Sequence, residues 1–131
     1  MIYFLYFLII SCSSNTPNNT YIEKDYYPNG QLKYELQKQD GLIDGYAKYW
    51  DKNGCLINEV NYSNGVFHGT WKEYYRNGNL KSSIVYSYGL KDGYEYWYYD
   101  NGQKKSETLY FKGDIKNSTI RWNMNGELIY K

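Results

Sequence analysis

The dipeptide Asn-Gly recurs every 24 residues along this chain of 131 residues. The five copies are Asn29-Gly30, Asn53-Gly54, Asn77-Gly78, Asn101-Gly102 and Asn125-Gly126. Two further glycine series keep the same period: Gly41, Gly65, Gly89 and Gly113, and then Gly45, Gly69 and Gly93, with Asn117 at the next position of that series. Three series with one period indicate an array of repeats, in which each unit contacts only its neighbours.

The composition of each repeat favours β-structure. Asn followed by Gly provides the left-handed backbone conformations of tight hairpin turns, so we predict a structural turn at each of the five pairs. Between turns, apolar and polar residues alternate, as at Leu32 and Leu36 against Lys33 and Glu35. The chain has 19 Tyr and only 2 Pro, which also suits strands. We therefore predict an all-β fold, an elongated antiparallel meander of about five hairpins joined by Gly-x-x-x-Gly turns, with about ten strands.

Aromatic residues fall into two groups. One position is aromatic in every repeat, and we expect its rings to pack as a stacked ladder along the inside of a curved sheet: Tyr26, Trp50, Tyr74, Tyr98 and Trp122. Other aromatic positions vary between repeats, and a residue that only some units need is available for a ligand. The candidate binding residues are therefore Tyr49, Trp71, Tyr75, Trp97 and Tyr99. The alternative is that these rings also belong to the core.

The first residues differ from the repeats. Ile2–Ile10 is an uncharged apolar run directly before Ser11 and Cys12. As a helix it would cover about 14 Å, too short for a bilayer core of roughly 30 Å. A run of this length followed by small residues is typical of a secretory leader. Ile9-Ile10-Ser11-Cys12 resembles the bacterial lipoprotein box, which implies a signal peptide over residues 1–11 and lipid on Cys12. A polar tether (12–21) and a repeat domain (22–131) would follow; the alternative is a hydrophobic N-terminal strand.

No catalytic or metal-binding pattern is present. The formal net charge of +1 gives no reason to expect a nucleic-acid partner. If Cys12 is lipidated, Cys55 has no disulfide partner, and we interpret it as an incidental exposed thiol. The single histidine, His68, occupies the repeat position of Asp44 and Asp92 before a glycine, so we interpret it as an exposed turn residue.

The glutamates at one repeat position predict a charged surface. Glu35, Glu59 and Glu107 would form a row with lysines two positions away, which indicates a solvated face with cross-strand pairing rather than the carboxylate pair of a hydrolase. We therefore expect no enzyme, no catalytic residues, no metal and no cofactor.

Three segments carry a resemblance to a known family. "GYAKYWDKNGCL", "GTWKEYYRNGNL" and "GYEYWYYDNGQK" resemble the bacterial variant of MORN repeats, whose pattern is roughly G-x-W-x-x-Y-Y-x-N-G-x-L. The resemblance covers approximately Tyr26 to Lys131 and implies a β-hairpin sheet that serves as a binding or scaffolding module. Many bacterial members are labelled antitoxins.

Together with the leader, the resemblance predicts a lipid-anchored protein-interaction module of the bacterial cell envelope. Ser13, rather than an acidic residue, follows Cys12, which favours the outer membrane. The expected partners are the membrane, through the lipid, and a protein of unknown identity, with no nucleic acid. Two alternatives stay open: an antitoxin or immunity protein that binds a cognate toxin, and glycan or peptidoglycan binding through exposed aromatic rings.

Overall fold

The structure is a computed structural model that describes residues 19–130, without the side chain of Tyr130. The predicted leader, Cys12 and most of the predicted tether lie outside these residues. The first strand begins at Thr20, two residues before the predicted start of the repeat domain.

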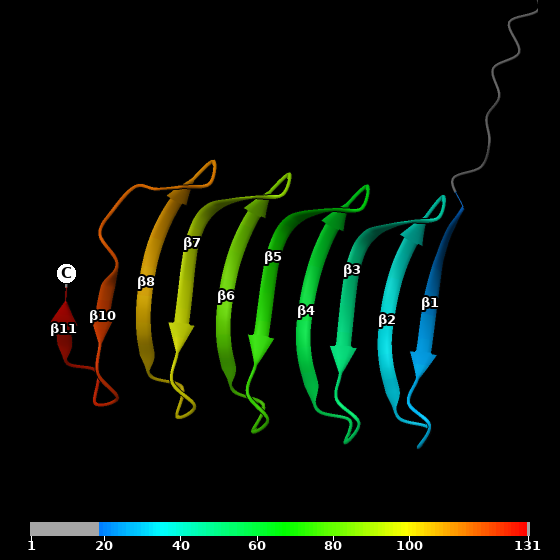
Figure 1. The fold of residues 1–131 in the computed structure, drawn as a ribbon, viewed down its shortest axis with the longest axis horizontal. Coiled ribbons are helices and arrows are strands. Elements are labelled where there is room, and N and C mark those ends of the chain that lie inside the picture. The colour runs from blue at the N-terminus through cyan, green and yellow to red at the C-terminus, as the bar shows by residue number, and fades with distance from the viewer. Residues whose placement is uncertain (1–18, 131) are drawn as a thin grey trace, which may run out of the picture.

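The described residues form one open antiparallel sheet (Figure 1) and include no helix. Its long strands are β1 (Thr20–Tyr26), β2 (Leu32–Gln39), β3 (Leu42–Trp50), β4 (Leu56–Ser63), β5 (Val66–Tyr74), β6 (Leu80–Ser87), β7 (Leu90–Tyr98) and β8 (Lys104–Phe111). Three short strands follow: β9 (Asp114–Ile115), β10 (Ile120–Trp122) and β11 (Leu128–Tyr130). Neighbours in the chain are neighbours in the sheet, except that β8 pairs with both β9 and β10. The predicted all-β meander is confirmed, with 11 strands.

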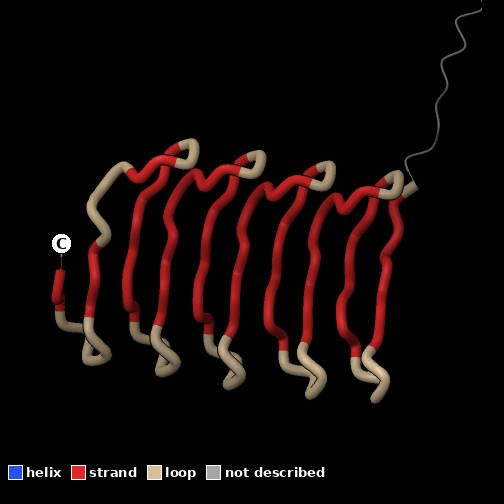
Figure 2. The backbone as a smooth tube through the Cα atoms, viewed as in Figure 1, coloured by secondary structure: helices blue, strands red, loops and turns tan. Residues whose placement is uncertain are grey.

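The two ends of the hairpins carry different turns (Figure 2). In the Asn-Gly turns only the glycine has positive φ, between 83° and 86°, so the Asn residues do not use the left-handed conformation that we predicted. The opposite turns have two left-handed residues each, of which the first is Asp40, Asn64, Tyr88 or Lys112 and the second is the glycine that follows. Two left-handed residues are the signature of the two-residue hairpin turn of type I′. The Asn-Gly turns are longer loops in which one left-handed glycine ends the turn.

The predicted Gly-x-x-x-Gly turn is wrong in its second half. Gly41 lies in the turn, but Gly45 lies inside β3, at a break in register. Ala47 pairs with Leu36 and Ile43 pairs with Lys38, so three residues of β3 oppose Gln37 alone. An added Cβ at Gly45, with φ of 111°, would stand 2.5 Å from Cδ of Gln37. The second glycine therefore permits the bulge, because its positive φ is a backbone conformation that residues with a side chain rarely adopt.

The core is a single row of side chains on one side of the sheet. Leu36, Ala47, Val60 and Ile84 are the buried apolar residues of the described chain, and Ala47 is 0% exposed. They lie on neighbouring strands, with Leu36 opposite Ala47 and Ala47 opposite Val60. Because residues 19–130 form no second layer over the sheet, packing within this face provides their core.

The predicted aromatic ladder does not form. The recurrent aromatic position is the last residue of β1, β3, β5, β7 and β10, where Tyr26 pairs with Leu32 and Trp50 with Leu56. No ring contact within the described residues joins two members of this series. A complete strand separates successive members, a spacing of about 10 Å that direct ring stacking cannot bridge.

Candidate binding surface

One side of the sheet carries the core row and, on either side of it, a further row of cross-strand side chains. We call this side the aromatic face. The period of two in each strand places Trp71 on this side, opposite Val60 and Ile84. Trp71 is one of four half-buried rings that cluster in the middle of the sheet: Tyr62, Phe67, Trp71 and Tyr86.

Phe67 is the centre of this aromatic cluster. Its ring centroid lies 5.0 Å from that of Tyr62, 5.3 Å from that of Tyr86 and 5.8 Å from that of Trp71, which is stacked on it at 19°. The indole N–H of Trp71 is buried and has no hydrogen-bond partner among the described residues. Packing, rather than hydrogen bonding, therefore fixes the Trp71 ring.

Ion pairs flank the cluster on both sides. On β1 and β2, Nζ of Lys38 lies 2.7 Å from Oε2 of Glu23. On β7, Nζ of Lys91 lies 2.6 Å from Oε1 of Glu95, and the Tyr110 hydroxyl donates to the other oxygen at 3.3 Å. Glu95 is 8% exposed and occupies the repeat position of Ala47 and Trp71, so the fourth repeat replaces an apolar core residue with a paired carboxylate.

The five predicted binding residues separate into two groups. Tyr49, Trp71 and Trp97 lie on the aromatic face: Tyr49 packs on Tyr34 with centroids 6.4 Å apart, and Trp97 lies between Ser82 and Ser106 of neighbouring strands. Tyr75 and Tyr99 instead lie in the Asn-Gly turns. The Tyr75 hydroxyl donates to the carbonyl of Tyr98, and the Tyr99 hydroxyl to that of Trp122. The structure thus brings together three of the five on one face.

Sequence reasoning missed Phe67, Tyr62 and Tyr86 as part of this surface. Their repeat positions hold Ile43 and Lys91 in one case, and Lys38 and Tyr110 in the other. The information needed to find them was the strand register across the bulge, which places Tyr62 opposite Phe67. That register depends on the glycine bulge, which we had predicted as a turn.

The other side of the sheet is the charged face. One cross-strand row on it alternates in sign from β1 to β5: Lys24, Glu35, Lys48, Glu59 and Lys72. The Lys24–Glu35 and Lys48–Glu59 ion pairs measure 2.7 Å and 3.4 Å. The predicted charged face with cross-strand pairing is therefore present, although Glu35 and Glu59 pair with lysines of the odd strands.

Hydrogen bonds stabilise the charged form of these carboxylates. The hydrogen bond from Lys24, followed by that from Tyr46, lowers the pKa of Glu35. The hydrogen bond from Tyr74, at 2.7 Å, is the main cause that lowers the pKa of Glu59. In turn, burial and the bond to Glu59 raise the pKa of Tyr74 to about 12. These groups hold one another in fixed protonation states, which is unlike a general acid or base that exchanges protons near neutral pH.

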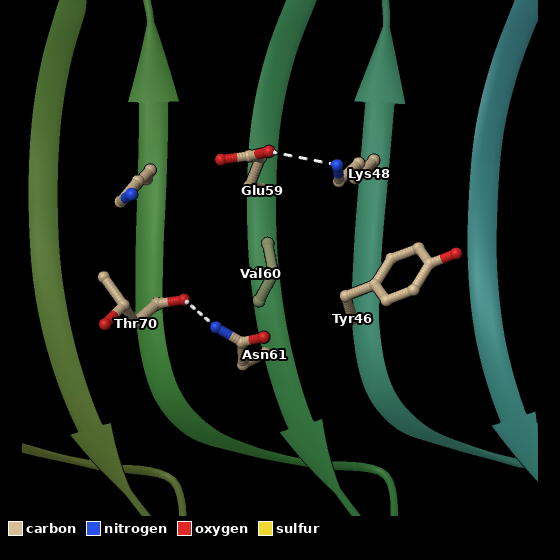
Figure 3. Close-up of a pocket in the computed structure, with 7 residues that line it drawn as sticks. Tyr46, Lys48, Glu59, Val60, Asn61 and Thr70 are labelled. Carbon is tan, nitrogen blue, oxygen red and sulfur yellow. Dashed lines mark hydrogen bonds and ion pairs between the residues drawn. The ribbon is translucent and has the colours of Figure 1, made fainter.

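The surface has several hollows, of which one lies on the charged face and another near the C-terminal end of the sheet. The first, of about 230 Å³, lies over β3, β4 and β5 (Figure 3). Its polar groups bond to each other, as in the Lys48–Glu59 pair and the 3.1 Å bond from Asn61 to the carbonyl of Thr70. The second, of about 640 Å³, is lined by Leu109, Phe111 and Lys116, where Asn117 interrupts the glycine series.

The remaining predicted residues have structural surroundings. His68 lies on β5, where Nδ1 accepts a 3.4 Å hydrogen bond from the backbone N–H of Tyr88. Cys55 is half-buried and carries a free thiol. Within residues 19–130, no three His, Cys, Asp or Glu side chains come together as a metal site. The same residues include no helix with the length and apolar character needed to span a bilayer.

Comparison with protein families gives one match. The MORN repeat variant family matches four successive segments, at residues 22–37, 43–64, 67–88 and 91–112. Each of the last three covers all but the first residue of one long odd strand, the Asn-Gly turn that follows it, and the next strand. The searches find no matching curated protein and no matching solved structure. The matched segments make up more than half of the sequence, and the chain belongs to the MORN repeat variant family.

Proposed function

We propose that this chain is a lipid-anchored, non-enzymatic protein-interaction module of the cell envelope, and that its partner binds the aromatic face. One observation carries the proposal. The sheet is a single layer, so the cluster around Phe67 has no covering element among the described residues.

The surroundings of the cluster have the anatomy of a protein interface. Such interfaces have an apolar centre rich in Tyr, Trp and Phe, with a polar rim that carries hydrogen bonds and ion pairs. Here the rings of β4, β5 and β6 form the centre, while the Glu23–Lys38 and Glu95–Lys91 pairs form the two flanks. Rings held by their neighbours lose little conformational entropy on binding. Repeat stacking also provides a long surface that suits an extended partner.

Photo-crosslinking tests the binding surface directly. We expect a photoreactive phenylalanine analogue in place of Tyr86 to give a discrete adduct in the native host, because this ring belongs to the cluster and contacts Phe67 and Trp71. The same analogue in place of Tyr96, on the charged face, is the matched control. Identical adducts from both positions, or none from position 86, would contradict the proposal. A toxin encoded nearby as the crosslinked protein would identify the immunity alternative.

The lipid anchor is supported by the apolar run before Ser11-Cys12, and it is tested separately. Metabolic labelling with an alkyne fatty acid should mark the wild-type protein and the Cys55→Ser variant, but not Cys12→Ala. Cys12→Ala should also leave the membrane fraction. Label on the Cys12→Ala protein would exclude Cys12 as the lipidated residue.

Glycan binding is the second candidate, and Trp97 is the observation that favours it. This ring stands on the aromatic face between Ser82 and Ser106, away from the Phe67 cluster, and sugars commonly stack on a ring with hydroxyl groups beside it. Retention on isolated cell-wall material should fall for Trp97→Ala and not for Tyr96→Ala. Equal retention of the two variants would reject glycan binding at this ring.

A further inference from the structure

The five Asn-Gly turns share one backbone geometry. Their glycines have φ of 84°, 85°, 86°, 85° and 83° in chain order. In each turn the glycine N–H donates to the carbonyl of the residue three positions earlier, at 2.8–3.0 Å. All five asparagines are exposed to solvent. The turns are therefore five copies of one local structure within a single molecule.

Three of the turns hold the asparagine side chain at both of its polar atoms. Oδ1 of Asn29, Asn77 and Asn101 accepts from the backbone N–H two residues later, at 3.0–3.2 Å. Nδ2 of the same residues donates to the carbonyl 23 residues later, in the next Asn-Gly turn, at 2.7–3.3 Å. Each of these turns begins with a tyrosine, at positions 27, 75 and 99.

The other two turns begin with Asp51 and Asn123, and they are held differently. Oδ1 of Asp51 accepts from the N–H groups of Asn53 and Cys55, and Oδ1 of Asn123 accepts from those of Asn125 and Glu127. In these two turns the first residue therefore accepts the backbone N–H bond that the turn asparagine accepts in the other three.

The side chains of Asn53 and Asn125 are consequently restrained by few hydrogen bonds. Asn53 retains one bond of 3.4 Å, from its Nδ2 to Oδ2 of Asp51. The Asn125 side chain makes no hydrogen bond to the described residues.

We propose that Asn53 and Asn125 are selective sites of spontaneous deamidation. The backbone nitrogen of the following glycine attacks Cγ of the asparagine, a C–N bond forms, and a five-membered succinimide closes. The Cγ–Nδ2 bond breaks, and ammonia leaves with the proton from the glycine N–H. Water then opens the ring at either carbonyl and gives Asp or isoaspartate. The net change is addition of one water and loss of one ammonia, with no oxidant or reductant.

Side-chain restraint explains the selectivity. The next residue is glycine in all five turns, so no neighbouring Cβ blocks the attack and the sequence context is equal. For Cγ to turn toward the glycine nitrogen, Asn29, Asn77 and Asn101 must break two hydrogen bonds each. Asn53 breaks one long bond and Asn125 breaks none within residues 19–130. We expect about a tenfold or larger difference in rate, which corresponds to ~1.4 kcal/mol or more in the barrier.

Peptide mapping by mass spectrometry tests the proposal on the full folded chain during incubation in mildly alkaline buffer. Asn125 and Asn53 should deamidate first, about tenfold faster than Asn29, Asn77 and Asn101. In urea the five rates should converge, because the turn contacts are lost. Equal rates in the folded protein, or the same rank order in urea, would overturn the proposal.

A matched pair of variants tests the cause. Asp51→Tyr gives the second turn the first residue of the protected turns and should let Asn53 bond to the carbonyl of Arg76, 23 residues later, which slows its deamidation about tenfold. Tyr75→Asp should release Asn77 and raise its rate toward that of Asn53. An unchanged rate at Asn53 in folded Asp51→Tyr would show that the first turn residue does not control the reaction. This result alone decides the point if Tyr75→Asp fails to fold.

Discussion

The hydroxyl of Tyr75 donates a 2.8 Å hydrogen bond to the backbone carbonyl of Tyr98, one repeat further along the chain. The Tyr27–Trp50 and Tyr99–Trp122 pairs repeat this contact at 2.9 Å and 3.0 Å. The bond joins the Asn-Gly turn after β5 to the end of β7, although these two strands do not pair with each other in the sheet. It therefore ties neighbouring hairpins together at the loop end, where the sheet ladder has already stopped.

Loss of this hydroxyl should destabilise the array. Tyr75→Phe removes the donor and leaves the Tyr98 carbonyl with one partner fewer, so we expect the free energy of unfolding to fall by about 1 kcal/mol in urea titrations. Tyr88→Phe is the matched control, because this residue is 73% exposed. An equal loss in the two variants would show that the contact between turns contributes nothing.

The one-row core should be sensitive to truncation. Leu36 is 8% exposed and packs in the row with Ala47 and Val60. Leu36→Ala should therefore cost about 2–4 kcal/mol of unfolding free energy, as for a core leucine in a protein with a thicker interior. Leu128→Ala, at a position 56% exposed, should cost less than about 0.5 kcal/mol. A small effect at Leu36 would mean that the row is not the energetic core.

The Lys91–Glu95 pair should be replaceable by the apolar residues of the second repeat. Glu95→Ala alone leaves Lys91, with a side chain 31% exposed, without its carboxylate, and should destabilise by about 1–3 kcal/mol. Lys91→Ile with Glu95→Ala recreates Ile43 and Ala47 and should recover most of that loss. Thermal unfolding of the two single variants and the double variant measures the coupling. A double variant less stable than both single variants would contradict this expectation.

Alkaline pH should unfold the protein through its tyrosines. Burial raises the pKa of Tyr62 to about 12, and burial with the Glu59 hydrogen bond raises that of Tyr74 to about 12. The ordinary pKa of a tyrosine side chain is 10.0, so the unfolded chain loses these protons first as pH rises. Their contribution to stability is complete below pH 10 and is lost progressively up to about pH 12.

Ultraviolet titration of tyrosinate together with unfolding curves measures this effect. Tyr62→Phe and Tyr74→Phe should each flatten the fall in stability over that range, because each removes one shifted phenol. Tyr88→Phe, which removes an exposed phenol, is the control. An unchanged slope in both the Tyr62→Phe and the Tyr74→Phe variants would contradict the assignment.

The repeat pattern was sufficient to predict the strands and their order. Each Asn-Gly pair ends one strand and begins the next within a few residues, so the information is local, and antiparallel neighbours follow from short turns. The roles of individual residues needed the register. Gly45 has the same local signature as a turn glycine, yet the pairing of β3 with β2 places it in a bulge opposite Gln37 of another strand.

The candidate surface was partly predictable for the same reason. Trp71 was identified because its repeat position is aromatic in only some units, and it does lie in the aromatic cluster. Phe67 could not be chosen from spacing alone, because only the shifted pairing beyond the bulge sets it beside Tyr62 and Tyr86. Tyr75 shares the aromatic character of Trp71, but its partner, a backbone carbonyl, leaves no trace in side-chain patterns.

The open meander has one consequence for how such a protein changes in length. A barrel fixes its strand number by closure, whereas here each hairpin requires only the hairpin on either side. An in-frame duplication of 24 codons would therefore extend the molecule by two strands, about 10 Å, without disturbing the others. Unequal recombination can thus change the length of the sheet by whole repeats, without altering the side chains of the existing repeats.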